Sequence, residues 1–442
     1  MNHPTTLSPP PGSGAEAGAP VAAADAADAD TDAEALGLRH RVPDADRRSR
    51  LYRAAGRYAP VLALYGGLKL IGFTVFMYLL DSAGDFRHKH PRFGGGAHPW
   101  DVLASWDGWW YQQVAAHGYT PALIPDPNGT DLITLKGNSA AFFPLYPASM
   151  RLVSDCTGLG LYGSGMLVSI LASFVAALGI YAVTARFGGG RAGLAAAGLW
   201  AVWPGSGTEW SAYSESLYVA LAVWACHSVM NDRWLTAGVL TFAAGLGRPT
   251  AVALIAALTV AALLALHRRR EDFARPWTAI LVAPLGLVGY LLWVGNQMGD
   301  LAGYFTLQKG AWAHTFDFGE QTLDVFASLA VGRSDYLFAC PVEDMIGAMT
   351  VLLGLLLLPL LIRLRPPAVL TVYTILTFVL VLGSQQIFGN VSRYLLPAFP
   401  LLIPPAVKLR GLGLPTLTAL LAVTAVASGS YAGYALFELG VP

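Results

Sequence analysis

One short stretch of the sequence combines a carboxylate with several large aromatic side chains. In "SWDGWWYQQ", Asp107 lies among Trp106, Trp109, Trp110 and Tyr111. A carboxyl group beside apolar rings has its pKa raised towards neutrality, and such a group can take a proton from a hydroxyl as a general base. The stretch therefore makes Asp107 a candidate catalytic base.

A structural interpretation of the same residue stays open. Ser105 could cap a helix that begins here, which would place Asp107 in the first turn, where the helix dipole favours an acidic side chain. Asp101 is a rival base, but it is not directly followed by an aromatic cluster as Asp107 is. His117 is expected to lie at the end of the helix and not at a metal.

Two arginines at breaks in long apolar runs are candidates to bind an anion. Arg248 lies in "GRPT" and Arg393 lies in "SRYLLP". An unpaired guanidinium at membrane depth is costly and usually functional, and its planar fork suits bidentate contact with a phosphate. The alternative is that each arginine only extends its charged head to the interface, or pairs with Glu209 or Glu215.

A further acidic side chain begins another apolar run. The stretch "YSES" contains Ser214 and Glu215. A carboxylate near membrane depth is expensive unless it has a role, so Glu215 is expected to bind substrate hydroxyls or to orient Arg248.

Other polar side chains give weaker signals. Lys309 and Arg333 are secondary candidates, because charges in loops are usually only solvated. The three cysteines, Cys156, Cys226 and Cys340, show no metal-ligand spacing. The sequence predicts no cofactor and no metal site, while a divalent ion at a pair of carboxylates stays an open alternative.

The composition sets the class of protein. Of the 442 residues, 55% are hydrophobic and 13% are charged, whereas soluble proteins carry about 25% charged residues. The 28 Lys and Arg balance the 28 Asp and Glu, so nothing indicates a nucleic-acid partner. We expect an all-α polytopic membrane protein.

Apolar runs of roughly the length that spans a bilayer follow one another along the chain. We expect about eleven transmembrane helices, at approximately 58–80, 163–184, 192–209, 212–230, 234–247, 249–266, 277–298, 338–362, 367–384, 393–408 and 413–437. Residues 1–56 form a separate region, because 1–38 lack large apolar side chains and are expected to be disordered. Seven arginines between Arg39 and Arg57 then predict a cytoplasmic anchor.

The positions of the basic residues predict the topology. With the N-terminus in the cytoplasm, the inner gaps between runs should be basic, and they contain Arg186, Arg191, Arg233, "HRRREDFAR", Arg363, Arg365, Lys408 and Arg410. The membrane domain, 57–442, then has two long outer loops, at about 81–162 and 299–337. Because long structured loops usually carry function, we expect the site on the extracytoplasmic face, with interfacial helices in the first loop.

Five stretches together resemble a known family. They are "WDGWWYQQVAAHGY", "AFFPLYP" (141–147), "SAYSESLYVAL" (211–221), "GRPTAVAL" (247–254) and "SRYLLPAFPLL" (392–402). In this order they are similar to the signature stretches of PIG-V-type mannosyltransferases, which are membrane glycosyltransferases of the GT-C superfamily. The resemblance runs from about residue 55 to the end and departs from the family at "WPGSGTEW" (203–210).

The resemblance implies a GT-C-like bundle and an enzyme that uses a polyprenyl-phosphate-linked mannose or other hexose. It implies that this donor is presented at the outer leaflet and that Asp107 is the base. Beside the resemblance, we expect an inverting transfer to a lipid or glycan acceptor, with Trp110, Tyr111, Ser214 and Glu215 in contact with substrate. The Ala-, Gly- and Arg-rich composition favours a bacterial cell membrane over the endoplasmic reticulum. The alternative is a transporter or flippase for a lipid-linked sugar, although no matched pair of broken helices indicates two repeated halves.

Overall fold

The computed structural model describes residues 44–442 except 123–137, 269–272, 334–339, 386–387 and 441. The segment 1–38, for which we predict disorder, lies outside the described residues. The chain divides into two units, Met1–Arg57 and Tyr58–Pro442, and the helices of the second unit form the candidate site.

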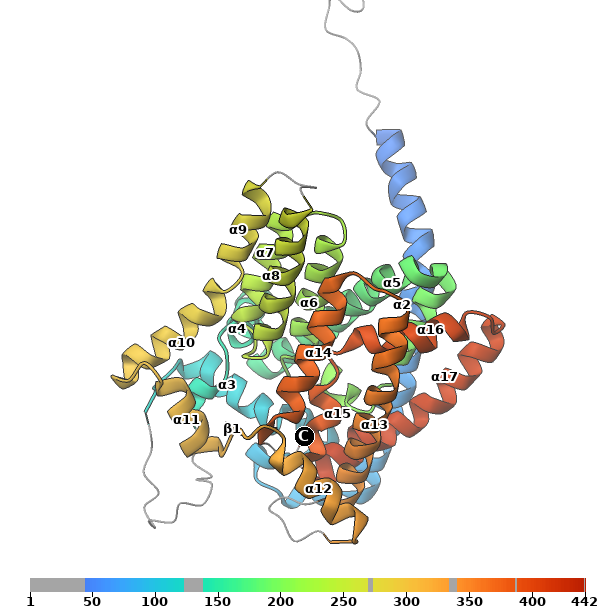
Figure 1. Ribbon diagram of the computed structural model, residues 1–442. Coiled ribbons are helices and arrows are strands. Elements are labelled where there is room, and N and C mark those ends of the chain that lie inside the picture. Colours follow the sequence, from blue (N-terminus) through green and yellow to red (C-terminus); the bar gives the residue numbers. More distant parts are fainter. Residues whose placement is uncertain (1–43, 123–137, 269–272, 334–339, 386–387, 441) are drawn as a thin grey trace, which may run out of the picture. The chain divides into compact units, whose positions relative to one another are not determined.

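Long apolar helices dominate the second unit (Figure 1). Among the described residues, five segments are long and apolar enough to cross a membrane: Tyr58–Ala83 in helix α2 (Asp44–Ala83), α5 (Leu161–Ala201), Ala274–Met298, α13 (Pro341–Arg363) and Leu414–Leu439. Shorter apolar helices are α7 (Trp234–Gly245), α8 (Ala251–His267), α14 (Ala368–Leu382) and the segment Phe399–Leu409. The prediction of an all-α polytopic membrane protein is confirmed.

In the described residues, each of the eleven predicted apolar runs overlaps helix, but glycine and proline set the boundaries. Gly189 interrupts α5 with φ 76°, a left-handed conformation that glycine adopts without a steric penalty. The second and third predicted runs therefore lie on either side of this kink. The seventh run is divided into α9 (Ala274–Val282) and α10 (Leu285–Met298) near Pro284.

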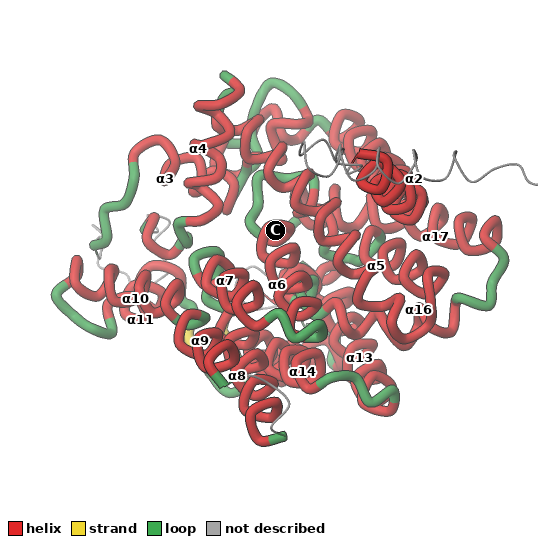
Figure 2. The backbone as a smooth tube through the Cα atoms, turned by 90° about the horizontal axis from the view of Figure 1, so that it is seen from above, coloured by secondary structure: helices red, strands yellow, loops and turns green. Residues whose placement is uncertain are grey.

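The helices of the core approach one another closely because many of their contact residues are small. Helix α5 packs against α6 (Glu215–Val229), α6 packs against α7, and α8 packs against α14. A Cβ atom on Gly179 of α5 would lie 2.4 Å from Cγ1 of Val223 in α6. Small residues at such contacts are typical of helix packing in membranes. Figure 2 shows the bundle from above, with α6, α7, α8 and α14 side by side.

Short elements occupy the two predicted outer loops. The first contains η1 (Asp85–His88), η2 (Pro91–Phe93), η3 (Pro99–Ala104), α3 (Asp107–His117), η4 (Ser139–Ala141) and α4 (Leu145–Thr157). The second contains α11 (Gly303–Trp312), β1 (Thr315–Phe316) and α12 (Glu320–Ala330). Strand β1 pairs antiparallel with β2 (Ser384–Gln385), so the second loop is attached to the end of α14.

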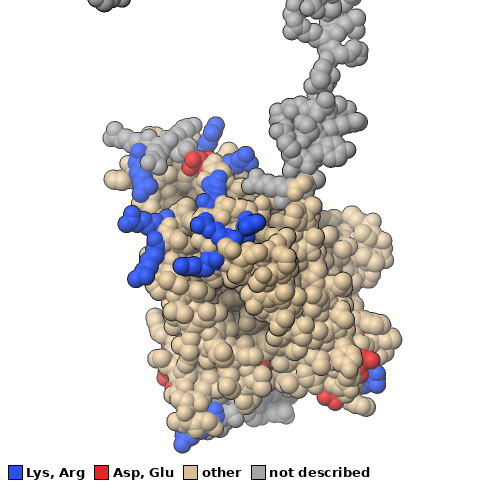
Figure 3. Space-filling view, turned by 90° about the vertical axis from the view of Figure 1, so that its right-hand side faces the viewer, with Lys and Arg blue, Asp and Glu red and all other residues tan. Residues whose placement is uncertain are grey.

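The last part of the chain consists of short helices before a final long one. They are η6 (Phe388–Asn390), α15 (Val391–Tyr394), η7 (Phe399–Leu402), α16 (Ile403–Leu409), α17 (Leu414–Gly429) and the π-helix Ser430–Leu439. Figure 3 shows Lys and Arg side chains gathered over one end of the visible face, while its middle is almost uncharged. Such a segregation of basic side chains is typical of a protein with one cytoplasmic face.

Candidate active site

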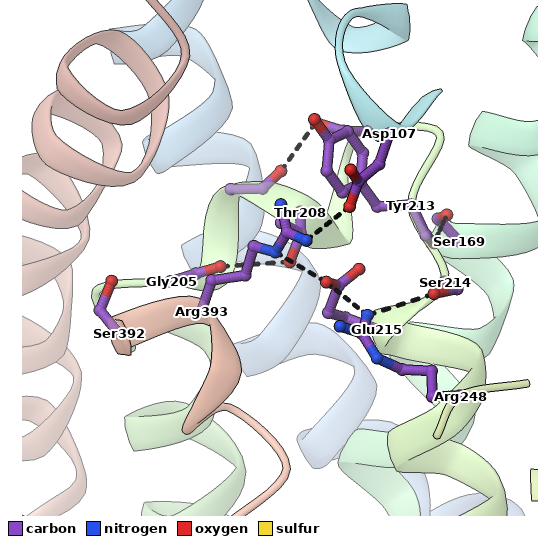
Figure 4. Close-up of polar contacts among 12 residues, drawn as sticks. Asp107, Ser169, Gly205, Thr208, Tyr213, Ser214, Glu215, Arg248, Ser392 and Arg393 are labelled. Atoms are coloured by element: carbon purple, nitrogen blue, oxygen red, sulfur yellow. Dashed lines mark hydrogen bonds and ion pairs between the residues drawn. The ribbon is translucent and has the colours of Figure 1, made fainter. Parts of the chain in front are cut away.

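Four charged side chains from distant parts of the sequence meet at one place (Figure 4). Asp107 is the first residue of α3, and Glu215 is the first residue of α6. Arg248 lies in the break between α7 and α8, and Arg393 lies in the short helix α15. The sequence singled out all four residues, and the fold brings them together.

The four side chains form a continuous chain of ion pairs. Nη2 of Arg393 lies 2.5 Å from Oδ2 of Asp107, and Nε of the same arginine lies 2.8 Å from Oε1 of Glu215. Nη1 of Arg248 lies 2.5 Å from that same Glu215 oxygen. Glu215 therefore fixes both guanidinium groups, which includes the predicted orientation of Arg248.

Hydroxyl and aromatic groups hold this arrangement. The Tyr111 hydroxyl donates to Oγ of Ser214 at 2.7 Å, and Nη1 of Arg248 donates to the same oxygen at 3.2 Å. The guanidinium of Arg393 lies over two rings, 5.1 Å from the centroid of Tyr213 and 4.9 Å from that of Tyr394. Cation–π contacts of this kind strengthen when the cation is desolvated.

Burial differs among the four groups. The side chains of Arg393 and Glu215 are 3% and 1% exposed, whereas that of Asp107 is 25% exposed. The two cations and two anions balance, which offsets part of the cost of removing them from water. Nη1 of Arg393 is nevertheless buried without a hydrogen-bond partner in the described part of the chain. A desolvated guanidinium donor without a partner is suited to bind an anionic group.

Asp107 has the chemical character of a base. Burial raises the pKa of its carboxyl group, and the positive charge of Arg393 acts in the opposite direction. A carboxylate with a raised pKa binds a proton more readily than an ordinary aspartate and can accept one from a hydroxyl.

A cavity of about 540 Å³ contains the exposed part of this cluster. Asp107, Arg248 and Arg393 contribute to one part of its wall, together with Tyr111 and Tyr394. Apolar side chains from α8, α10, α11 and α14 form much of the remainder, including Val252, Leu287, Leu291, Phe305 and Leu380. The cavity can therefore hold a ligand that has an anionic group and a large apolar part.

One expectation about the start of α3 needs correction. Ser105 does not cap the helix, because its hydroxyl donates to the Val102 carbonyl at 2.6 Å and the N-cap residue is Trp106, with φ 51°. The rival base Asp101 lies in η3, where its Oδ2 accepts from the backbone N–H of His98 at 2.9 Å. Asp107 does lie in the first helical turn, as expected.

The alternative that the two arginines pair with Glu209 or Glu215 is confirmed for Glu215, whereas Glu209 has other partners. Oε2 of Glu209 lies 2.9 Å from Nζ of Lys69 and accepts from the Tyr65 hydroxyl. Lys69 also donates to the Ser206 carbonyl at 2.8 Å. A lysine inside the first helix was therefore available to satisfy this buried carboxylate.

The remaining predicted residues differ in whether they contact the charged cluster. Tyr111 and Ser214 belong to it, whereas the ring of Trp110 stacks on Phe142 with centroids 5.8 Å apart. Lys309 and Arg333 are exposed, and neither lines the cavity.

Sequence reasoning missed several polar and aromatic groups of the cavity. They are Thr250, Tyr304, Gln308, Trp312, His314 and Tyr394. Of these, Tyr394 and Thr250 had a signal, because they lie in the quoted stretches that contain Arg393 and Arg248. Among the described residues, no group of three or more His, Cys, Asp or Glu side chains is arranged to hold a metal ion.

Comparisons with known proteins concern the fold. No model of a known protein family matches the sequence, and no curated protein sequence matches it either. Solved structures of the Archaeoglobus fulgidus oligosaccharyltransferase are similar. The apo form has a TM-score of 0.44 and 14% sequence identity, and the match covers 84% of this chain. The complex with Zn and sulfate has a TM-score of 0.42 and 14% identity, again over 84% of this chain. A third, AglB in complex with an inhibitory peptide and a dolichol-phosphate, has 0.41, 12% and 84%.

This chain spans only part of those proteins. It covers 56% of the length of the apo chain, 53% of the chain with Zn and sulfate, and 56% of the chain with dolichol-phosphate.

Proposed function

We propose that this protein is a GT-C-type membrane glycosyltransferase that moves a mannosyl or other hexosyl group from a polyprenyl-phosphate donor to a lipid or glycan acceptor. The observation that carries the proposal is the partly exposed carboxylate of Asp107 beside Arg393, whose Nη1 is buried without a partner among the described residues. The two groups supply a base and a phosphate-binding cation in one cavity. The five sequence stretches similar to PIG-V-type enzymes support the same chemistry.

The proposed reaction is an inverting displacement at the anomeric carbon. Asp107 takes the proton of the acceptor hydroxyl while the acceptor oxygen forms a bond to the anomeric carbon. At the same time, the bond from this carbon to the phosphate oxygen breaks. The electron pair leaves with the phosphate. One negative charge thereby passes from Asp107 to the phosphate, and Arg393 and Arg248 stabilise it there.

The geometry suits this transfer of charge. Arg393 contacts Asp107 through Nη2 and Glu215 through Nε, which leaves Nη1 for the phosphate. As Asp107 becomes neutral, its attraction to Arg393 weakens, and the attraction between Arg393 and the increasingly negative phosphate becomes stronger. The apolar wall of the cavity is the proposed contact surface for the start of the prenyl chain.

The activity can be tested with purified protein in detergent. A short-chain polyprenyl-phosphate mannose is expected to be consumed and to release polyprenyl phosphate when a lipid or glycan acceptor extract is added. Mass analysis of both products measures the reaction, and the Asp107→Asn variant serves as the control. An intact donor in every acceptor mixture would contradict the proposal, and movement of the unchanged donor across proteoliposomes would indicate a transporter.

The proposed topology places the site on the extracytoplasmic face of a cell membrane. Cys156 near the end of α4 is exposed, so it provides a native reporter for the first outer loop. In a Cys340→Ser background, an impermeant maleimide is expected to label Cys156 in intact cells. A cysteine placed near position 130 of the same loop, which lies outside the described residues, is expected to be labelled in the same way.

A matched control reports the opposite face. With Cys156 and Cys340 both changed to Ser, Arg410→Cys is expected to react only after the cells are permeabilised, because Arg410 is exposed beyond the end of α16 in a predicted inner gap. Labelling of Arg410→Cys in intact cells together with protection of Cys156 would reverse the topology and remove the site from the outer face.

A further inference from the structure

One side of the cavity is built by a single short segment of the second outer loop. Gln308 and Trp312 of α11 and His314 directly after it all line the cavity that contains Asp107 and Arg393. None of the three carries a formal charge that would compete with the arginines for a phosphate. This wall therefore differs in chemistry from the charged cluster.

The backbone fixes this segment in place. Ala313 ends α11 with φ 52°, in the left-handed region, and the backbone N–H of His314 donates to the Gln308 carbonyl at 3.1 Å. Immediately afterwards, β1 pairs with β2, and Oγ1 of Thr315 donates to Oε1 of Gln385 at 2.9 Å. His314 is therefore held between a helix end and a strand pairing and does not lie in a free loop.

The polar atoms on this wall have unused hydrogen-bonding capacity. Nε2 of Gln308 donates to the Tyr304 hydroxyl at 2.7 Å, but Oε1 is buried without a partner among the described residues. Burial and the positive charge of Arg393 lower the pKa of His314 to about 4. Its imidazole is therefore neutral near pH 7 and offers one donor and one acceptor.

An aromatic surface lies beside these groups. The centroid of the Trp312 ring is 5.5 Å from that of Phe142 and 5.5 Å from that of Trp110. Ligand pockets commonly combine such apolar and aromatic surface with a few placed polar groups that fix the orientation of the ligand.

We propose that Gln308, Trp312 and His314 form the recognition site for the hydroxyl groups of the transferred sugar. This inference rests on the proposed function. A sugar ring has neutral hydroxyls that both donate and accept, which an amide oxygen and a neutral imidazole match. The arginines bind the phosphate, and the aromatic ring of Trp312 covers an apolar face of the sugar.

The test compares a full donor with donors that lack one hydroxyl. The probes are a short-chain polyprenyl-phosphate mannose and its four monodeoxy analogues, deoxygenated at positions 2, 3, 4 or 6. The wild-type protein is expected to use at least one analogue about 10- to 100-fold less efficiently, because a missing hydroxyl leaves a buried polar group unpaired. In Gln308→Met, kcat/KM for the full donor is expected to fall by a similar factor. This variant should then use one particular analogue as efficiently as it uses the full donor.

His314→Phe is expected to remove the discrimination at a different hydroxyl, and His314→Asn is expected to restore part of it because the amide is neutral and polar. Thr306→Val on the exposed side of α11 is the matched control and should keep the wild-type pattern. Thermal unfolding in detergent separates a lost contact from a damaged fold, and His314→Asn keeps the test informative if His314→Phe does not fold.

The outcomes separate this inference from the proposed function. If the protein turns over the full donor but both variants keep wild-type discrimination, the recognition site is wrong while the glycosyltransferase stands. If the variants alter only KM for the acceptor, the wall binds the acceptor and the inference is overturned. If the wild-type protein turns over no polyprenyl-phosphate sugar, the proposed function itself fails.

Discussion

Asp107→Asn is expected to lower turnover by about 10²- to 10⁴-fold, the usual loss when a positioned general base is removed. Asparagine keeps the size and polarity of aspartate but cannot take up the proton of the acceptor. The measurement is kcat with a polyprenyl-phosphate mannose in detergent, together with thermal unfolding of each variant. Because Asn also breaks the ion pair with Arg393, some loss of stability is expected as well.

Asp101→Asn is the matched control. Its carboxylate accepts a hydrogen bond from the backbone of His98, and loss of such a cap costs about 1 kcal/mol. Turnover should therefore remain close to wild type. Full activity of Asp107→Asn would leave its carboxylate with a structural role only, and an inactive Asp101→Asn beside an active Asp107→Asn would transfer the catalytic role to Asp101.

Arg393→Lys is expected to lower kcat by about 10²- to 10³-fold, the loss typical of removing one donor aimed at developing negative charge. A lysine keeps the charge but cannot contact Asp107, Glu215 and a phosphate at once as the planar guanidinium can. Arg393→Ala should also reduce stability by about 3–5 kcal/mol, because it leaves buried carboxylates without their partner. Steady-state kinetics in the donor and thermal unfolding measure the two effects.

Arg248→Lys provides the comparison within the same site. Its side chain is 14% exposed and pairs with Glu215 but not with Asp107, so its replacement is expected mainly to raise KM for the donor. Unchanged kinetics in Arg393→Lys, Arg393→Ala and Arg248→Lys would refute the phosphate assignment. Lys309 and Arg333 would then be the next cations to examine.

The sequence was sufficient to predict the apolar helical segments and the four charged residues that the fold brings together. Long apolar runs predict helices because a backbone in lipid must satisfy its own hydrogen bonds. Asp107, Glu215, Arg248 and Arg393 stood out because a charge near membrane depth is expensive. Both arguments depend only on composition and position along the chain.

The contacts between those residues could not be predicted in the same way. Asp107 and Arg393 are 286 residues apart, and no local pattern predicts that they pair. Glu209 pairs with Lys69 of the first long helix, and no local pattern predicts that contact either. Gln308 and His314 had no signal, because a neutral polar side chain acquires a role only from the tertiary fold that surrounds it.

The buried pair of Lys69 and Glu209 has a consequence for the assembly of the protein. Lys69 lies in the first long helix, and its partner is synthesised only after several further helices. A lysine at the centre of an inserting helix costs about 2.5–3.5 kcal/mol, which the apolar residues of that helix must offset until Glu209 arrives. We therefore expect the first helix to enter the bilayer with Lys69 unpaired. It can make its final contacts only after the segment around Glu209 has been synthesised.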